Sequence, residues 1–389
     1  MIKRSWASAW LAPMLLLCAL SVAPAQRIPI RKEAGPRLIT APFRICTGGD
    51  VTLGNNLDRA WARGAADTLW KRFGLRDAPD SLLAALKPFV ADADVVLLNV
   101  ESAIGSGPAP RKCSPSSKNC YAFRSPSSAA GALRRLVDST AAVVGNIANN
   151  HSRDAGDDGR DTTIALLTAA GVDVTGRDTL ATPVALANGD TIGVLGFYTS
   201  ADTPDARDLA AVQRHVARAA EQYEIVIVTM HLGGEGATAQ RTRNATETFL
   251  GINRGNPVGF ATASFAGGAT LVVGHGPHVL RAGEWRGNRL ALYSLGNLLT
   301  YGPFNVRDPS NRGVVACATI DSARHVSSAE LRSTVQVWPG VLRADSTNRA
   351  WKLVDSLSAL DFPRTGVTVD ASGNLRRRPN VRPGRSPDR

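Results

Sequence analysis

The feature that most constrains the fold is the alternation of short apolar, β-branched runs with segments of helical periodicity over the first 275 residues of the chain. The strand-like runs are Phe43–Thr47, Val95–Asn99, Ala142–Ile147, Ile192–Tyr198, Ile225–Met230 and Thr270–Gly274. The helical segments between them are Ser81–Val90, Ser127–Val137, Thr162–Ala170 and Asp208–Gln222. This alternation predicts an α/β domain around a largely buried sheet. From Leu280 the pattern becomes hairpin-like, which predicts a second sheet or an antiparallel edge.

The N-terminus carries a second organising signal. Lys3 and Arg4 precede an uncharged run from Ser5 to Gln26, and the run contains the small-x-small sequence Ala23-Pro24-Ala25. This predicts a signal peptide over residues 1–25 and an exported, periplasmic or otherwise extracytoplasmic protein. A run of 22 uncharged residues can also just span a bilayer, so a retained N-terminal anchor is the alternative.

Composition divides the rest of the chain. Residues 26–42 contain three Pro and predict a linker, and residues 43–345 predict one main domain. Residues 346–389 predict a C-terminal extension, with a basic, disordered tail from about residue 372. Within the main domain, Gly236–Gly268 is rich in Gly, Thr and Asn and predicts a surface insertion with a helix or two.

The net charge of +12 suggests an anionic partner, but it is concentrated at the ends of the chain. The Arg-rich tail lies among Pro residues and has no interleaved aromatic side chains, so nucleic-acid binding is not expected. A mildly basic body is compatible with an anionic polymer or a phosphoester substrate.

Removal of the signal peptide leaves four cysteines, an even count that is compatible with disulfides in an exported protein. Cys113 and Cys120 enclose six residues of a polar, turn-rich loop and predict a local disulfide. A zinc site is disfavoured there because no second Cys or His pair lies nearby. Cys46 and Cys317 lie in apolar runs and are expected to be buried thiols.

Polar clusters follow five of the strand-like runs. They are Gly48-Gly49-Asp50, Asn99-Val100-Glu101, Asn149-Asn150-His151, His231-Leu232-Gly233-Gly234-Glu235 and His275-Gly276-Pro277-His278. Because the carboxyl ends of strands in an α/β sheet form one edge, we expect these side chains to converge. Taken alone, an Asp in such a cluster can be a turn or helix-capping residue, and a His can be a hydrogen-bonded polar side chain that binds no ligand. The coincidence of five clusters at the same structural position favours a shared site.

Carboxylate, imidazole and amide oxygen together suit a divalent ion such as Mn, Fe or Zn. Two carboxylates with three or four His exceed what one four-coordinate ion needs, so a two-metal centre is predicted. Such a centre can hold both the attacking and the leaving oxygen of a displacement at phosphorus.

The same clusters, taken in order, resemble the motifs of the CapA-type capsule synthesis family. That family is named for poly-γ-glutamate capsule biosynthesis and belongs to the calcineurin-like metallophosphatase superfamily. The resemblance runs from residue 48 to 297 and ends at Tyr293-Ser294-Leu295-Gly296-Asn297. It implies a metallophosphatase-like, four-layer α/β/β/α sandwich with the metal centre at the loop edge of two sheets.

The resemblance also implies ligands for the ions. Asp50 and His278 would bind the first ion, and Glu101 would occupy the position of the bridging carboxylate. Asn150, His231 and His275 would bind the second ion.

Three further roles are implied near these ligands. His151 would protonate the leaving oxygen, which suits an imidazole because its ordinary pKa lies near neutrality. Asp154 would either orient His151 or close the turn before Gly156, and the turn is favoured. Glu235 would fix the tautomer of His231 or form a salt bridge elsewhere.

The sequence departs from the superfamily pattern at two positions beside the site. Thr52 stands where the superfamily usually has a His, so the first ion lacks one expected ligand. Gly276 stands where the family more often has a His, and the final pair is spaced His-x-x-His.

Two functions are compatible with these features. The first is an exported, metal-dependent hydrolase of a phosphoester or polyglutamate-type substrate, acting in capsule polymer biosynthesis or export. The alternative is a non-catalytic component that binds a polyanion within that machinery. In both cases membrane-bound capsule synthesis proteins are the expected partners.

Overall fold

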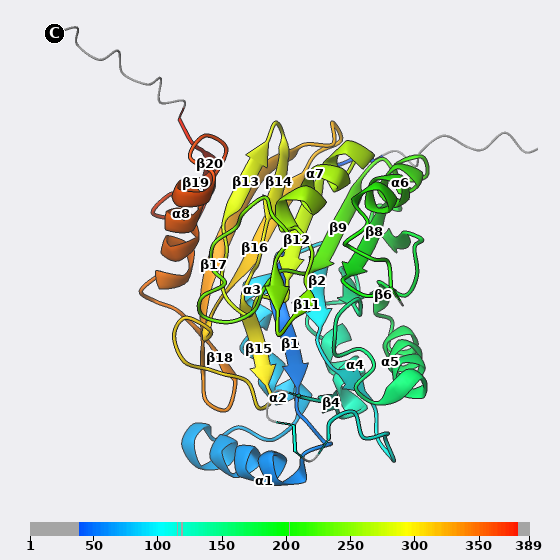
Figure 1. Ribbon diagram of the computed structural model, residues 1–389, viewed down its shortest axis with the longest axis vertical. Helices are drawn as coiled ribbons and strands as arrows, with labels where there is room; N and C mark the ends of the chain where they lie inside the picture. Colours follow the sequence, from blue (N-terminus) through cyan, green and yellow to red (C-terminus); the bar gives the residue numbers. More distant parts are fainter. Residues whose placement is uncertain (1–38, 115, 118–119, 202, 380–389) are drawn as a thin grey trace, which may run out of the picture. The chain divides into compact units, whose positions relative to one another are not determined.

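Two β-sheets packed face to face form the centre of the protein (Figure 1). The computed structural model describes residues 39–379 apart from residues 115, 118–119 and 202, and these residues belong to one compact unit. The predicted signal peptide and most of the predicted linker therefore lie outside the described residues.

The larger sheet has the strand order β18-β17-β16-β1-β2-β5-β6, with β15 also paired to β1. Its strands are β1 (Phe43–Leu53), β2 (Val95–Val100), β5 (Ala142–Asn146), β6 (Asp173–Thr175), β15 (Asn297–Tyr301), β16 (Arg312–Ile320), β17 (Val326–Val337) and β18 (Val341–Ala344). The smaller sheet has the order β13-β14-β12-β9-β8-β7. Its strands are β7 (Thr182–Ala185), β8 (Thr191–Tyr198), β9 (Val226–His231), β12 (Leu271–His275), β13 (Gly283–Arg286) and β14 (Arg289–Leu292).

Three short strand pairs lie outside the two sheets. They are β3 (Ala103–Ile104) with β4 (Arg124–Ser125), β10 (Thr248–Phe249) with β11 (Ile252–Asn253), and β19 (Val367–Val369) with β20 (Leu375–Arg377). The helices are α1 (Arg59–Thr68), which continues as the π-helix η1 (Leu69–Phe73), α2 (Pro79–Leu83), α3 (Lys87–Val90), α4 (Ser128–Arg134), α5 (Gly156–Ala169), α6 (Leu209–Ala220), α7 (Pro257–Gly267) and α8 (Arg349–Asp361).

Apolar side chains from both sheets interdigitate to form the central core. Ile45 and Val144 of the larger sheet belong to one buried cluster with Val194, Ile227 and Val273 of the smaller sheet. All six residues of β2 and all six of β9 are buried, because these central strands are covered on both faces. This burial explains why they appear in the sequence as continuous apolar runs rather than as alternating ones.

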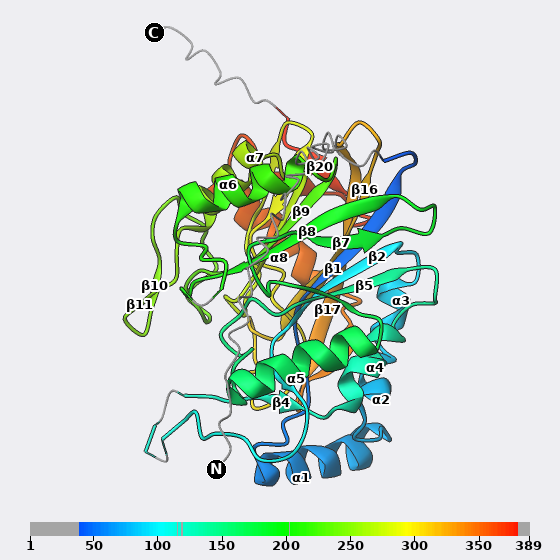
Figure 2. The ribbon, with the colours of Figure 1, turned by 90° about the vertical axis from the view of Figure 1, so that its right-hand side faces the viewer.

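Helices cover the outer face of each sheet. Leu83 of α2, Leu133 of α4 and Leu167 of α5 pack in a cluster with the larger sheet, whereas Val216 of α6 and Phe260 of α7 pack with the smaller one. Figure 2 shows the resulting order from top to bottom, with α6 and α7, the smaller sheet, the larger sheet, and then α5, α4 and α2. The four-layer α/β/β/α sandwich and the single main domain are therefore confirmed.

Capping residues explain where several helices begin. The carboxylate of Asp58 accepts hydrogen bonds from the first turn of α1, and Asp208 does the same for α6. Asn256 caps α7, and Pro257 follows it at the first helical position, where a missing N–H costs nothing. The segment Gly236–Gly268, predicted to be a surface insertion, contains the β10–β11 hairpin and this helix. The prediction is wrong for α7, because Phe260 and Phe265 are buried in the core beside the smaller sheet.

A bulge in β1 turns Asp50 toward the site. The pairing of β1 with β2 shifts register between Thr47 and Asp50, and its pairing with β15 shifts after Asp50. At Gly49 a Cβ atom would lie 1.8 Å from the carbonyl oxygen of Gly296, so only glycine permits this approach of the two backbones. The Gly-Gly-Asp sequence is therefore required by the geometry that directs Asp50 inward.

The packed structure extends past both predicted boundaries of the main domain. Ile39, placed in the linker, is buried in the central core, and its N–H donates to Glu224. At the other end, Trp351 and Val354 of α8 belong to the same core. The β19–β20 hairpin extends to Arg377, past residue 372, where disorder was expected, because Leu375 is buried against that core.

The four cysteines of the described chain form two disulfides. Cys113 pairs with Cys120, as the loop between them predicted. Cys46 pairs with Cys317, which corrects the expectation of buried thiols. The two residues lie directly opposite each other on the antiparallel strands β1 and β16, with their Cα atoms 4.0 Å apart.

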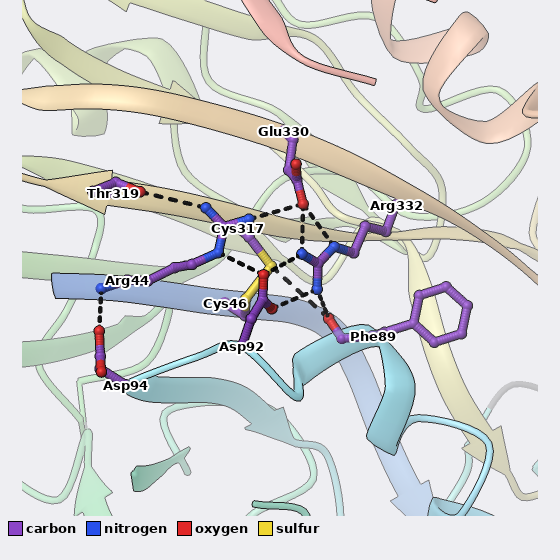
Figure 3. Close-up of a disulfide and its surroundings, with 9 residues drawn as sticks. All are labelled: Arg44, Cys46, Phe89, Asp92, Asp94, Cys317, Thr319, Glu330 and Arg332. Carbon is purple, nitrogen blue, oxygen red and sulfur yellow. Dashed lines mark hydrogen bonds and ion pairs between the residues drawn. A yellow bond between two sulfur atoms is a disulfide. The ribbon is translucent and has the colours of Figure 1, made fainter. Parts of the chain in front are cut away.

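Charged side chains surround the Cys46–Cys317 disulfide (Figure 3). Arg44 and Arg332 each contact the carboxylates of Asp92 and Glu330 at 2.6–3.0 Å. Asp92 lies close enough to the two sulfur atoms to suggest a metal site, but the sulfurs are bonded to each other. The network therefore covers the disulfide on this side and does not form a cation site.

No helix within the described residues is long and apolar enough to cross a bilayer. This finding applies only to the part of the chain from residue 39 to residue 379, with its gaps.

The Cys46–Cys317 disulfide should contribute more stability than the Cys113–Cys120 disulfide. The first closes a loop of 271 residues and the second a loop of 7, and the entropy removed from the unfolded chain grows with loop length. Replacement of Cys46 and Cys317 by Ala should lower the free energy of unfolding by about 5 kcal/mol, and replacement of Cys113 and Cys120 by about 2–3 kcal/mol. Denaturant unfolding of both double variants measures the difference, and an equal or reversed order would contradict the prediction.

Candidate metal centre

The carboxyl ends of strands from both sheets meet at one place. Asp50 comes from β1, Glu101 follows β2, and His231 ends β9. Each of these three residues offers a ligand atom within 4.8 Å of the others, and all three are fully buried. His275 ends β12 directly opposite His231 in the parallel ladder. The predicted convergence of the strand-end clusters is therefore present in the structure.

His278 brings a third imidazole to the two carboxylates. Its Nδ1 lies 3.1 Å from Asp50 Oδ2 and 2.9 Å from Asn297 Oδ1, and its Nε2 lies 3.5 Å from Glu101 Oε1. Because both neighbours of Nδ1 are oxygen acceptors, Nδ1 carries the proton, and Nε2 is the atom left to face a cation. His278 adopts φ +57°, a backbone conformation that side chains seldom adopt and that is characteristic of functional sites.

Several buried polar atoms of this cluster have no hydrogen bond within the described residues. They are both carboxylate oxygens of Glu101, Nε2 of His231 and both ring nitrogens of His275. Oδ1 of Asn150, the residue before His151, is also buried without a hydrogen bond. Buried polar atoms are almost always satisfied, so a concentration of exceptions signals a missing partner. Carboxylate, imidazole and amide donors together fit a divalent transition-metal ion.

Burial and mutual proximity perturb the ionisation of the centre. Burial, reinforced by Asp50, raises the pKa of Glu101 well above its usual range. Burial alone would lower the pKa of His278, but the carboxylates of Glu101 and Asp50 outweigh it and hold that pKa well above its ordinary value. Burial lowers the pKa of His275 to about 4, so this imidazole is neutral at physiological pH and suited to ligation.

His151 and Asp154 form a pair beside the centre. Nδ1 of His151 lies 2.6 Å from Asp154 Oδ2, and the carboxylate of Asp154 is fully buried. The alternative favoured from the sequence, that Asp154 only closes a turn, is therefore wrong, because its side chain orients His151. The His151 ring packs against Phe123, with centroids 4.4 Å apart, and burial lowers its pKa although Asp154 opposes the shift.

Glu235 does not contact His231 in the part of the chain that the structure describes. It forms an ion pair with the buried Arg254 at 2.9 Å, and its second oxygen lies 3.9 Å from His278 Nε2. Of the two roles considered from the sequence, the salt bridge is the one observed.

Asn99, and not Glu235, contacts Nδ1 of His231, and its side-chain nitrogen is a donor there, whereas a carboxylate would have been an acceptor. Its side-chain amide lies 3.1 Å from His231 Nδ1 and donates to Asp50 Oδ1 at 2.8 Å, while its carbonyl oxygen accepts from Asn146 and Asn149. Sequence reasoning placed Asn99 in a strand-end cluster without giving it a role. Its position two residues before Glu101, at the end of a buried strand, was the available signal.

The two departures from the superfamily pattern have local explanations. The hydroxyl of Thr52 donates to the backbone oxygen of Glu101 at 3.0 Å and so supports the loop that carries this carboxylate. Gly276 has φ +106°, and a Cβ there would lie 3.1 Å from His231 Nε2. A larger residue at position 276 would therefore press on the His231 ring.

Substitution of a clustered histidine should remove metal binding. His231→Ala should weaken Mn²⁺ or Zn²⁺ affinity by more than about 100-fold, beyond the 10–100-fold typical when only an outer-shell partner is lost. Metal content per chain, measured by mass spectrometry after equilibration at fixed free metal, tests this. His325→Ala, which changes a half-buried imidazole outside the cluster, is the matched control. Equal metal content in the two variants would contradict the assignment of this centre.

Metal binding should release protons at neutral pH. The raised pKa values of Glu101 and His278 mean that the metal-free centre retains protons that a cation must displace. Affinity should therefore increase as the pH rises through neutrality. Calorimetric titrations in buffers of different ionisation enthalpy measure the number released, and a value of zero would show that these groups do not bind the ion.

One family of known proteins matches the part of the chain that builds this centre. The model of the bacterial capsule synthesis protein family PGA_cap matches residues 44–301, about two thirds of the chain, and includes every residue of the centre. No curated protein sequence matches the chain at a significant level.

Three solved structures are similar to parts of the chain. A hypothetical protein from Thermus thermophilus is 15% identical with a TM-score of 0.40, over 75% of this chain and 98% of its own. GAP50, the anchor in the inner membrane complex of Plasmodium, is 10% identical with a TM-score of 0.34, over 81% of this chain and 95% of its own. The 5′-nucleotidase precursor from Thermus thermophilus is 11% identical with a TM-score of 0.35, over 83% of this chain and 59% of its own.

With TM-scores below 0.5, these similarities do not carry the fold assignment, which rests on strand order and layer packing. The family match instead spans the strands that supply the carboxylates and imidazoles of the candidate centre. The chain belongs to the bacterial capsule synthesis protein family PGA_cap.

Proposed function

We propose that this protein is an exported, divalent-metal-dependent hydrolase that cleaves a phosphoester bond during the synthesis or export of a capsule polymer. The observation that carries the proposal is the cluster of Asp50, Glu101, His231, His275 and His278, in which several buried polar atoms have no hydrogen-bond partner among the described residues. Family membership supports the link to capsule synthesis. The uncharged N-terminal run and the two disulfides support export.

The residues divide into two groups of ligands. Asp50 and His278 would hold one ion, Asn150, His231 and His275 a second, and Glu101 would lie between them. Such ions supply Lewis-acid stabilisation and an activated water when bound. Mn, Fe and Zn are the ions that this mixture of carboxylate, imidazole and amide donors suits.

His151 would manage the proton of the leaving group. Asp154 is an acceptor only, so the neutral imidazole keeps its proton on Nδ1 and leaves Nε2 free. When the imidazole is protonated, Nε2–H can donate to the departing oxygen while Nδ1–H stays on Asp154. Contact with Phe123 on one side and Asp154 on the other fixes the ring and the direction of that donation.

Substrate would reach the centre from the side of His278 and Glu235. Their side chains are 16% and 14% exposed, whereas those of Asp50, Glu101 and His231 are at most 1% exposed. Because the ligands are buried this deeply, the substrate would present the end or a protruding group of an anionic polymer to the centre. Membrane-bound capsule synthesis proteins are the proposed partners that supply such a polymer.

His151→Ala should abolish most turnover while metal remains bound. Loss of a general acid typically costs 10²–10⁴-fold, so kcat for phenyl phosphate should fall by about 10²–10⁴-fold. The assay uses the purified protein loaded with Mn²⁺, with aryl phosphate monoesters and diesters and with poly-γ-glutamate as alternative substrates. His215→Ala, on the surface helix α6, is the control.

Each outcome of this assay decides between functions. Hydrolysis of poly-γ-glutamate but not of phosphoesters would overturn the phosphoester assignment. A metal-loaded wild type that hydrolyses none of these substrates but binds poly-γ-glutamate in a salt-sensitive way would favour the non-catalytic, polyanion-binding alternative.

A further inference from the structure

Two groups besides His151 bind the carboxylate of Asp154. One is the ammonium group of Lys112, which forms an ion pair with Asp154 Oδ1 and also donates to the backbone oxygen of Asn150 at 3.1 Å. The other is the backbone N–H of Phe123, which donates to Asp154 Oδ2 at 2.6 Å. Asp154 thus has three donors around a fully buried carboxylate.

Both of these donors come from the ends of the disulfide loop. Lys112 immediately precedes Cys113, and Phe123 lies three residues after Cys120. The disulfide holds the Cα atoms of its two cysteines 5.6 Å apart, so the two chain ends that carry the donors must enter the site together. The side chain of Phe123 also supports the site, because its ring packs on the rings of His151 and Phe304.

Lys112 occupies the boundary between the site and solvent. Its side chain is 34% exposed, whereas that of Asp154 is not exposed at all. It lines a cavity of about 770 Å³ together with Arg59, Arg111 and Tyr121. Arg111, one residue earlier, lines the same cavity but is not among the residues that bind Asp154 in the described part of the chain, and it therefore provides a matched control.

We propose that Lys112 is a positioning residue for the His151 acid, and that the Cys113–Cys120 disulfide keeps it in place. This inference rests on the proposed function of His151. Lys112 fixes one oxygen of Asp154 and the Phe123 amide fixes the other, so the carboxylate presents a single orientation to His151 Nδ1. Phe123 is also held by the hydrogen bond from Ala103 N–H to its backbone oxygen, so loss of the disulfide should release Lys112 and leave the Phe123 amide on Asp154.

Chemical labelling tests the contact without any assay of activity. In the full chain, an amine-acylating reagent should modify Lys112 slowly compared with the exposed Lys87. Asp154→Asn, and separately the Cys113→Ser/Cys120→Ser pair, should each raise the acylation rate of Lys112 several-fold and leave that of Lys87 unchanged. Peptide mass spectrometry gives both rates. An unchanged rate for Lys112 in both variants would overturn the proposal.

Kinetics tests the positioning role. Lys112→Met should lower kcat by about 10–100-fold, the range seen when a partner behind an active-site side chain is removed, with little change in KM. Lys112→Arg should restore most of the activity, and Arg111→Met should match the wild type. The loss should be larger for phenyl phosphate than for 4-nitrophenyl phosphate, because a good leaving group has less need of a proton donor.

Two results would count against a positioning role. Equal losses for the two substrates would show a general structural effect, and equal activities of Lys112→Met and Arg111→Met would show no effect of the contact. A wild type that hydrolyses neither substrate would overturn the proposed function instead. The labelling result would then decide alone whether the disulfide loop holds Lys112 on Asp154.

Discussion

The burial of two carboxylates side by side is the constraint on which the rest of the structure depends. Asp50 and Glu101 are fully buried, and an uncompensated charge in such a place costs several kcal/mol. The polar groups around them come from different layers: the Asn99 amide from the larger sheet, His231 from the smaller sheet, and His278 from the loop that follows β12. These polar contacts and the face-to-face packing of the sheets therefore support each other, because neither sheet alone encloses the site.

Composition and periodicity over a few residues were enough to predict the layers of the fold. They were not enough to predict which distant strands pair. The buried runs of β2 and β9 and the capped helices between the strands follow from composition and periodicity over a few residues. The Cys46–Cys317 bond depends instead on the register of β1 against β16, which are 271 residues apart, and no local signal encodes that register. The burial of Ile39 and Val354 was missed for the same reason, since each completes a core built by other segments.

The residues of the candidate metal centre were also predicted only in part. Strand-end position alone identified Asp50, Glu101, His231 and His275, because parallel strands must deliver their ends to one edge. The partners that orient these residues were not predicted, since Asn99, Arg254 and Lys112 are ordinary polar residues until the fold places them. Glu235 illustrates the limit: the sequence left open a contact with His231 or a salt bridge, and the observed partner, Arg254, comes from a strand end 19 residues later.

The Cys46–Cys317 disulfide has a topological consequence for proteolysis of the chain. Every residue of the candidate centre, from Asp50 to Asn297, lies inside the covalent ring that it closes. The β10–β11 turn, where Leu250 and Ile252 are 59% and 56% exposed, is an accessible place for a cut. A chain cut there remains one covalent molecule, and both halves of the centre stay attached to the strands that position them. Cleavage at this turn would linearise the ring without separating its parts.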